Sequence, residues 1–286
     1  MESLYRLSAL VRGYDLRLGY NRVILGLSAL GALVAAAVRL VADATVEEAL
    51  WRAVAAGAAV FAAAAIAKEL DPDRPRAAVV AAAVAAAGAW FIRPDTLDVL
   101  AALLWLILAV RLINRSTGLR PKLSDALALL AVAAWLLWRG FPLFGALAGG
   151  VFLLDARLHD GRRLHAVLGA LALVSIAIAW ALGWVDLAPI PSGRWLTAGL
   201  LAVAVAFIPV ILTYYTVAAT ADATGAPLNG ARVQAGQAVA LGSGLSLASW
   251  QGQPGAALLF ALWAAFLGIV GYYLLITRAR RSAASL

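Results

Sequence analysis

The chain has 286 residues, of which 64% are hydrophobic and only 13% are charged. In soluble domains roughly 45–50% of residues are apolar and about 25% are charged. A soluble globular protein is therefore excluded, because it could not shield this apolar excess from water. The absence of cysteine excludes disulfides, thiolate metal sites and a cysteine nucleophile. We expect the net charge of +8 to reflect cationic cytoplasmic loops, with no nucleic-acid partner and no cofactor. Among the basic residues only Lys68 and Lys122 are lysines, a bias typical of a GC-rich prokaryotic genome.

Residues 1–22 are expected to form a basic amphipathic segment on the cytoplasmic surface of the membrane. Apolar residues are interspersed there with four arginines, which favours an interfacial helix; a basic, partly ordered tail is the alternative. The arginines are Arg6, Arg12, Arg17 and Arg22. Ala42-Asp43-Ala44 has the form of a signal-peptidase site, but it lies too far from the N-terminus for a leader of the usual 15–30 residues. No cleaved signal peptide is therefore expected.

Ten hydrophobic runs follow, and a membrane-spanning helix needs about 20 such residues. The runs lie near residues 23–42, 49–67, 77–92, 96–113, 124–138, 141–154, 164–185, 194–216, 234–250 and 255–277. The sequence therefore predicts an all-α fold, a polytopic integral membrane helix bundle of about ten transmembrane helices. These form a single domain over 23–277, followed by a basic cytoplasmic tail at 278–286. Nine spans are the alternative, because the two runs within 124–154 are each short for a bilayer.

The basic residues predict on which side of the membrane each loop lies. With the N-terminus in the cytoplasm, 18 of the 23 Lys and Arg residues fall on the inner side. The five on the outer side are Arg39, Arg52, Arg93, Arg139 and Arg194. Cytoplasmic loops carry the excess of positive charge, and all seven tyrosines fall at inner ends or before the first span. The chain is thus expected in a cell (inner) membrane with both termini cytoplasmic. The other inner segments are 68–76, 111–122, 155–165 and 217–233.

The inner loop 68–76 is a weak candidate for a magnesium site. An extended backbone would place Glu69, Asp71 and Asp73 on one side, and Mg²⁺ prefers oxygen ligands. The favoured alternative is structural, because three acids and three bases within nine residues neutralise one another. No metal is therefore expected.

The inner loop 155–165 combines acidic, basic and histidine side chains. Asp155 and Asp160 would diverge by about 140° on one helix, and His159 and His165 do not have a usual metal-ligand spacing. A plain cationic membrane anchor is one interpretation, and a binding site for a phosphate or an anionic headgroup is the other. The candidate contacts are Arg157, Arg162 and Arg163.

The two loops resemble those of the UbiA-type intramembrane prenyltransferases, which carry acidic motifs in two cytoplasmic loops. Leu10-Val11-Arg12-Gly13-Tyr14 and the run 161–169 are similar to segments of that family. This resemblance implies a transferase acting on a lipid or prenyl phosphate. The family's NxxxDxxxD and DxxxD spacings are absent, since this chain has Asp71/Asp73 and Asp155/Asp160.

The ninth run, 234–250, is the least lipid-like and is expected inside the bundle. Its small and polar residues permit close helix packing or line the path of a polar solute. In the preceding run, a proline frees a backbone carbonyl that other groups must satisfy in lipid. The residues expected to form this path or packing face are Pro209, Thr213, Gln234, Gln237, Ser243, Gly244 and Ser246.

Three functions remain after a search for motifs. No Walker loop, HExxH motif or nucleophile elbow is present, which disfavours an enzyme. No charged residue lies near the centre of a predicted span, which disfavours an ion-coupled pump. The favoured function is a permease or facilitator for a small or amphipathic solute. The alternatives are a structural or assembly subunit, with other membrane subunits as partners besides the membrane lipids, and an intramembrane lipid or prenyl-phosphate transferase.

Overall fold

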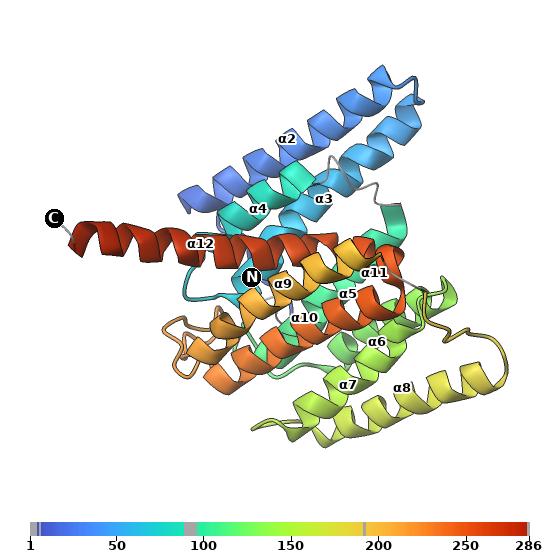
Figure 1. Cartoon of the computed structure of the whole chain (residues 1–286). Coiled ribbons are helices and arrows are strands. Elements are labelled where there is room, and N and C mark those ends of the chain that lie inside the picture. The colour runs from blue at the N-terminus through green and yellow to red at the C-terminus, as the bar shows by residue number, and fades with distance from the viewer. Residues whose placement is uncertain (1–4, 6, 89–95, 191–192, 285–286) are drawn as a thin grey trace. The chain divides into compact units, whose positions relative to one another are not determined.

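The computed structural model describes residues 5, 7–88, 96–190 and 193–284, and its regular elements are helices throughout this part of the chain. A single isolated bridge, between Thr220 and Pro227, is the only extended pairing there. The helices (Figure 1) are α2 (Gly19–Val41), α3 (Val46–Leu70), α4 (Ala77–Gly88), α5 (Thr96–Asn114), α6 (Leu123–Trp138), α7 (Leu143–Arg157), α8 (Arg163–Ala181), α9 (Arg194–Thr213), α10 (Gly230–Trp250), α11 (Gly252–Leu258) and α12 (Phe260–Ala284). The predicted all-α fold class is confirmed for the described residues.

The helices correspond one by one to the hydrophobic runs, with α11 and α12 sharing the last run. Five of them, α2, α3, α5, α8 and α9, are long and apolar enough to cross a membrane. A sixth span results if α11 and the first part of α12 count as one, although the chain bends by 68° between them. The 12 residues of α4 measure only about 18 Å, against about 30 Å of hydrocarbon. The described helices are thus compatible with a multi-pass membrane protein of five or six such spans, and ten remains a prediction.

The described helices form two compact units. Unit 1 comprises Met1–Gly13, Leu104–Thr197 and Ile211–Ala256, and unit 2 comprises Tyr14–Leu103, Ala198–Val210 and Ala257–Leu286. The boundary falls inside α5 and inside α9.

Small residues let the helices of unit 2 approach one another closely. In the α2–α3 hairpin, a Cβ on Gly57 of α3 would lie 3.2 Å from the backbone oxygen of Ser28 on α2. A Cβ on Gly268 of α12 would overlap the backbone of Ala81 on α4. Close backbone packing of this kind replaces the hydrophobic driving force that lipid does not supply.

Polar side chains make specific contacts at each end of the α2–α3 hairpin. Thr45 caps α3, accepting a hydrogen bond from the Glu48 amide while the Glu48 carboxylate accepts one from the Thr45 amide, which is a capping box. At the other end, Lys68 donates a hydrogen bond to Asn21 and lies over the rings of Tyr14 and Tyr20.

Residues 8–13 of the N-terminal segment belong to unit 1 and form irregular backbone. Between Ser8 and Leu18 the chain forms no helix, whereas the sequence predicted a helix over 1–22. Asp125 of α6 accepts hydrogen bonds from the Ser8 hydroxyl at 2.5 Å and the Ala9 amide at 3.1 Å. Arg12 forms a bidentate ion pair with Asp222, at 2.5 and 2.8 Å. Asp125 thus gives the Ala9 amide the acceptor that a helix would otherwise provide. Whether the segment touches lipid stays a prediction.

Candidate functional site

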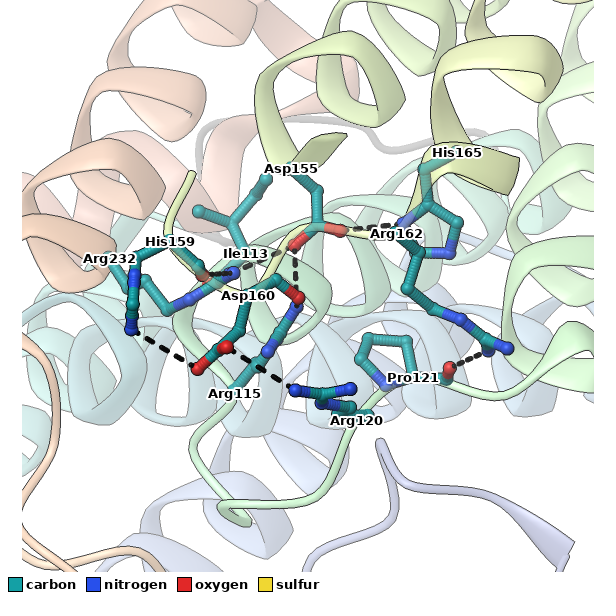
Figure 2. Close-up of polar contacts among 10 residues, drawn as sticks. All are labelled: Ile113, Arg115, Arg120, Pro121, Asp155, His159, Asp160, Arg162, His165 and Arg232. Carbon is teal, nitrogen blue, oxygen red and sulfur yellow. Dashed lines mark hydrogen bonds and ion pairs between the residues drawn. The ribbon is translucent and has the colours of Figure 1, made fainter. Parts of the chain in front are cut away.

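A buried carboxylate, Asp155 in the last turn of α7, is the centre of a polar cluster in unit 1 (Figure 2). Nδ1 of His165 donates to it at 2.7 Å, and a guanidinium nitrogen of Arg232 donates at 2.9 Å. A guanidinium nitrogen of Arg115 lies 3.5 Å from the same carboxylate. Asp155 and His165 are fully buried and Arg232 is 4% exposed, so these three side chains are withdrawn from bulk water, whereas Arg115 is half-buried.

The turn between α7 and α8 brings Asp155 opposite His165. Helix α7 ends at Arg157, and Asp160 adopts a positive φ of 62°. The next residue must be a glycine, because a Cβ on Gly161 would overlap the backbone oxygens of Asp155 and Ala156. The chain then reverses, and His165 falls in the first turn of α8.

Arg232 and Arg115 connect three segments of unit 1: the end of α5, the turn after α7 and the start of α10. Asn229 caps α10 by accepting from the Arg232 amide at 3.2 Å, which fixes Arg232 in the first turn. Its guanidinium also donates to the backbone oxygens of Ile113 at 2.9 Å and of His159 at 2.6 Å. Arg115 donates to the backbone oxygen of Asp160 at 2.8 Å. Two guanidiniums thus face one buried carboxylate, so the cluster has a surplus of positive charge.

Hydrogen bonds and neighbouring charges together set the ionisation of the cluster. Asp155 comes directly after the hydrophobic run 141–154, and Arg115 comes directly after the end of α5. Both residues therefore lie outside the predicted membrane spans. Burial alone would raise the pKa of Asp155, but hydrogen bonds from His165 and Arg232 and the charge of Arg115 outweigh it and hold that pKa below its ordinary value. Burial, reinforced by the charge of Arg232, lowers the pKa of Arg115. Asp155 is therefore ionised at neutral pH.

The Asp155–His165 pair has the form of a base held by an orienting carboxylate. Nε2 of His165 is buried and has no hydrogen-bond partner among the described residues. The ring of Phe152 packs edge-on against the imidazole, with 5.2 Å between ring centroids. The pair thus has an oriented base without a nucleophilic side chain bonded to it.

The three arginines predicted to contact phosphate lie around this cluster. Arg157 and Arg163 are exposed. Arg162 donates to the backbone oxygen of Pro121 at 2.6 Å, so part of its donor set is used for packing. At the rim, Arg120 pairs with Asp160 at 3.3 Å.

The polar residues of α9 and α10 separate into buried and exposed groups. On α10, Gln237, Ser243 and Gly244 are buried, and Ser246 is half-buried. Half-buried Gln234 donates its side-chain amide to the backbone oxygen of Ile211 at 2.9 Å, and so caps the end of α9. Two of the predicted residues, Pro209 and Thr213, are exposed.

The acidic loop after α3 belongs to unit 2. Glu69 and Asp71 are each 1% exposed, whereas Asp73 is exposed. Asp71 lies 3.5 Å from Arg74, whose guanidinium lies over the ring of Tyr273. No group of three or more His, Asp or Glu side chains suited to a metal ion occurs within the described part of the chain.

Two members of the Asp155 cluster were missed by reasoning from the sequence. The spacing argument measured Asp155 against Asp160 on one helix, whereas the turn pairs Asp155 with His165, ten residues on. The sequence placed Arg232 and Arg115 only among the positive charges expected on the inner side of the membrane. One signal for Arg232 was present: an arginine three residues after an N-capping asparagine, at the start of the most polar long helix.

No family model, no curated protein and no solved structure matches the chain. The resemblance to UbiA-type enzymes therefore carries no family assignment.

Proposed function

We propose that the chain is a multi-pass protein of a cell (inner) membrane, crossing it ten times with both termini in the cytoplasm. It acts as a permease or facilitator for a small or amphipathic solute. The buried polar face of α10 forms the solute path, and its inner end lies at Arg232. A guanidinium at that end favours solutes that carry an anionic or hydrogen-bond-accepting group.

The observation that carries the proposal is the burial of polar side chains along α10. Gln237 is 0% exposed and Ser243 is 1% exposed. Asn114, at the end of α5, is 2% exposed and lies against Gly236. Buried amides and hydroxyls in a membrane helix are costly unless they bond to something. These buried side chains, at separate positions of α10 and at the end of α5, supply groups that can form hydrogen bonds with a polar solute.

Contacts within unit 1 support the expected grouping of its loops on two sides of the membrane. In unit 1, the loop at 222–223 donates backbone hydrogen bonds to Ser116 and Thr117, in another segment expected inside. At the other end of α10, the Trp250 indole donates to the backbone oxygen of Leu187 at 2.8 Å, and both lie in segments expected outside. Loops assigned to one side by charge thus contact one another.

The experiment compares two glutamines of α10 in reconstituted proteoliposomes. Gln237→Leu removes a buried amide at similar volume, and Gln234→Leu removes the amide that caps α9. Uptake of glycerol, glycine, acetate and lactate is followed by light scattering after an osmotic step. We expect Gln237→Leu to lower the flux of the carried solute about tenfold, at a stability cost of about 1 kcal/mol or less. Gln234→Leu should destabilise the protein without this selective loss.

Two results would count against the proposal. If Gln237→Leu leaves every measured flux at the wild-type level, α10 is not a solute path. If the wild type itself carries none of the four solutes above the empty-liposome rate, the subunit alternative gains support.

A further inference from the structure

A cavity of about 470 Å³ lies in unit 2 at the α2–α3 turn. Its lining residues come from the end of α2, the start of α3 and the start of α5: Arg39, Glu48, Trp51, Arg52 and Leu97. The volume falls in the range of about 300–1,000 Å³ that suits small ligands.

The cavity lies at the opposite end of the hairpin from the Lys68–Asn21 hydrogen bond. Helix α2 has 23 residues and is therefore about 34 Å long, close to the thickness of the hydrocarbon core. If the Lys68 end is at the cytoplasmic interface, the cavity is at the outer interface. Trp51, 48% exposed, is the residue type that favours such an interface.

The charges around the cavity favour an anion. Arg39 and Arg52 contribute two guanidiniums, against the single carboxylate of Glu48. That carboxylate already accepts from the Thr45 amide at 3.1 Å, so part of its capacity is used in the capping box. Nε of Arg39 is buried and has no hydrogen-bond partner among the residues that the structure describes.

Apolar side chains near the cavity are exposed in the part of the chain that the structure describes. Leu97 is 57% exposed, Leu50 is 61% exposed and Val54 is 53% exposed. A ligand with an anionic head beside the arginines could lay an apolar tail along these side chains. A purely polar anion would use only the guanidiniums.

We propose that this cavity binds the phosphate group of an anionic lipid at the outer membrane interface. Arg39 and Arg52 hold the phosphate by charge-assisted hydrogen bonds, and Trp51 and Leu97 contact the glycerol and acyl region. The inference is independent of solute transport, because all lining residues belong to unit 2.

The test uses the full-length protein, delipidated in detergent, with native mass spectrometry of added phosphatidylglycerol or phosphatidylcholine. The wild type is expected to bind phosphatidylglycerol more tightly. Arg39→Gln should weaken that binding about tenfold, whereas Arg194→Gln, the same change at an exposed residue of α9 outside the cavity, should leave it unchanged. Glu48→Gln should strengthen binding severalfold, because it removes a negative charge while glutamine still completes a capping box.

Further arms protect the test from misfolding and distinguish the source of the phosphate. Arg39→Lys keeps the charge with fewer donors, so an intermediate affinity supports the site even if Arg39→Gln unfolds. Displacement of the lipid by millimolar inorganic phosphate would identify free phosphate as a competing occupant of the same anion site, and no displacement would identify the lipid as the ligand. Equal phosphatidylglycerol affinity in the wild type, Arg39→Gln, Arg39→Lys and Glu48→Gln would overturn the proposal.

Discussion

Asp155 illustrates how a single buried charge depends on its neighbours. Removal of a carboxylate from water costs several kcal/mol, and only close, well-oriented partners offset it. Asp155 has such partners in His165 at 2.7 Å and Arg232 at 2.9 Å. Because Arg232 is itself buried, the loss of Asp155 would leave that guanidinium without its carboxylate, whereas the loss of Arg232 would leave Asp155 with only His165 and Arg115.

Asp155→Asn should therefore lower the free energy of unfolding by about 3–5 kcal/mol, the cost of breaking a buried ion pair. The matched control is Asp160→Asn, in the same turn, whose side chain is 49% exposed and pairs with Arg120, 69% exposed. An exposed pair contributes about 1 kcal/mol or less, so this variant should stay near the wild type. Unfolding in mixed detergent and dodecyl sulfate measures both, and equal effects would show that burial of Asp155 does not matter to stability.

At the scale of elements, α10 is a polar helix that approaches the C-terminal end of α5 closely at one glycine. A Cβ on Gly236 would overlap the side-chain amide of Asn114, whereas a Cβ on Gly242, in the same helix, would meet nothing within 4 Å. A side chain at position 236 would have to displace Asn114, whereas a side chain at position 242 would meet no neighbour. The two glycines thus form an internal comparison.

Gly236→Ala should destabilise the protein by about 1–3 kcal/mol, the usual cost of forcing an extra group into a packed contact. Gly242→Ala should be neutral or stabilise by up to about 1 kcal/mol, because alanine is the better helix former. Thermal unfolding of the two variants in one detergent is the measurement. A Gly236→Ala protein as stable as Gly242→Ala would mean that α5 and α10 are not in contact at this position.

The element scale is also where prediction from the sequence succeeded and then stopped. Hydropathy located the helices. The capping box of Thr45 and Glu48 was not among the predictions, although the spacing of these two residues is the usual signal for one. The Asp155–His165 contact was not predictable, because it depends on the tight turn around Gly161 and not on helical spacing. The role of Gln234 was hidden for the same reason: its partner, a backbone oxygen of α9, lies 23 positions away in sequence.

At the scale of the whole molecule, the expected ten crossings can be tested by single cysteines, since the chain has none. Thr224→Cys and Asp73→Cys, both exposed and expected inside, should resist an impermeant thiol reagent added to intact cells. Glu47→Cys, exposed at the start of α3 and expected outside, should react. Ser116 is unsuitable as a probe because it is only 3% exposed.

Labelling in permeabilised cells is the control, since all three cysteines should then react. Reaction of Thr224→Cys in intact cells would contradict a cytoplasmic loop between α9 and α10. Failure of Glu47→Cys to react before permeabilisation would contradict an external α2–α3 turn.

Composition and pattern determined the class of this protein. Its 64% of hydrophobic residues and its long apolar helices are compatible with a multi-pass membrane protein. The lengths and spacing of the apolar runs determine where helices form, because helix formation follows from local backbone and solvation energetics. Tertiary structure alone decided that Asp155, His165, Arg115 and Arg232 share one buried cluster and that Arg39 lines a cavity. Such contacts join residues far apart in sequence, and their energy depends on distances and burial that no local pattern contains.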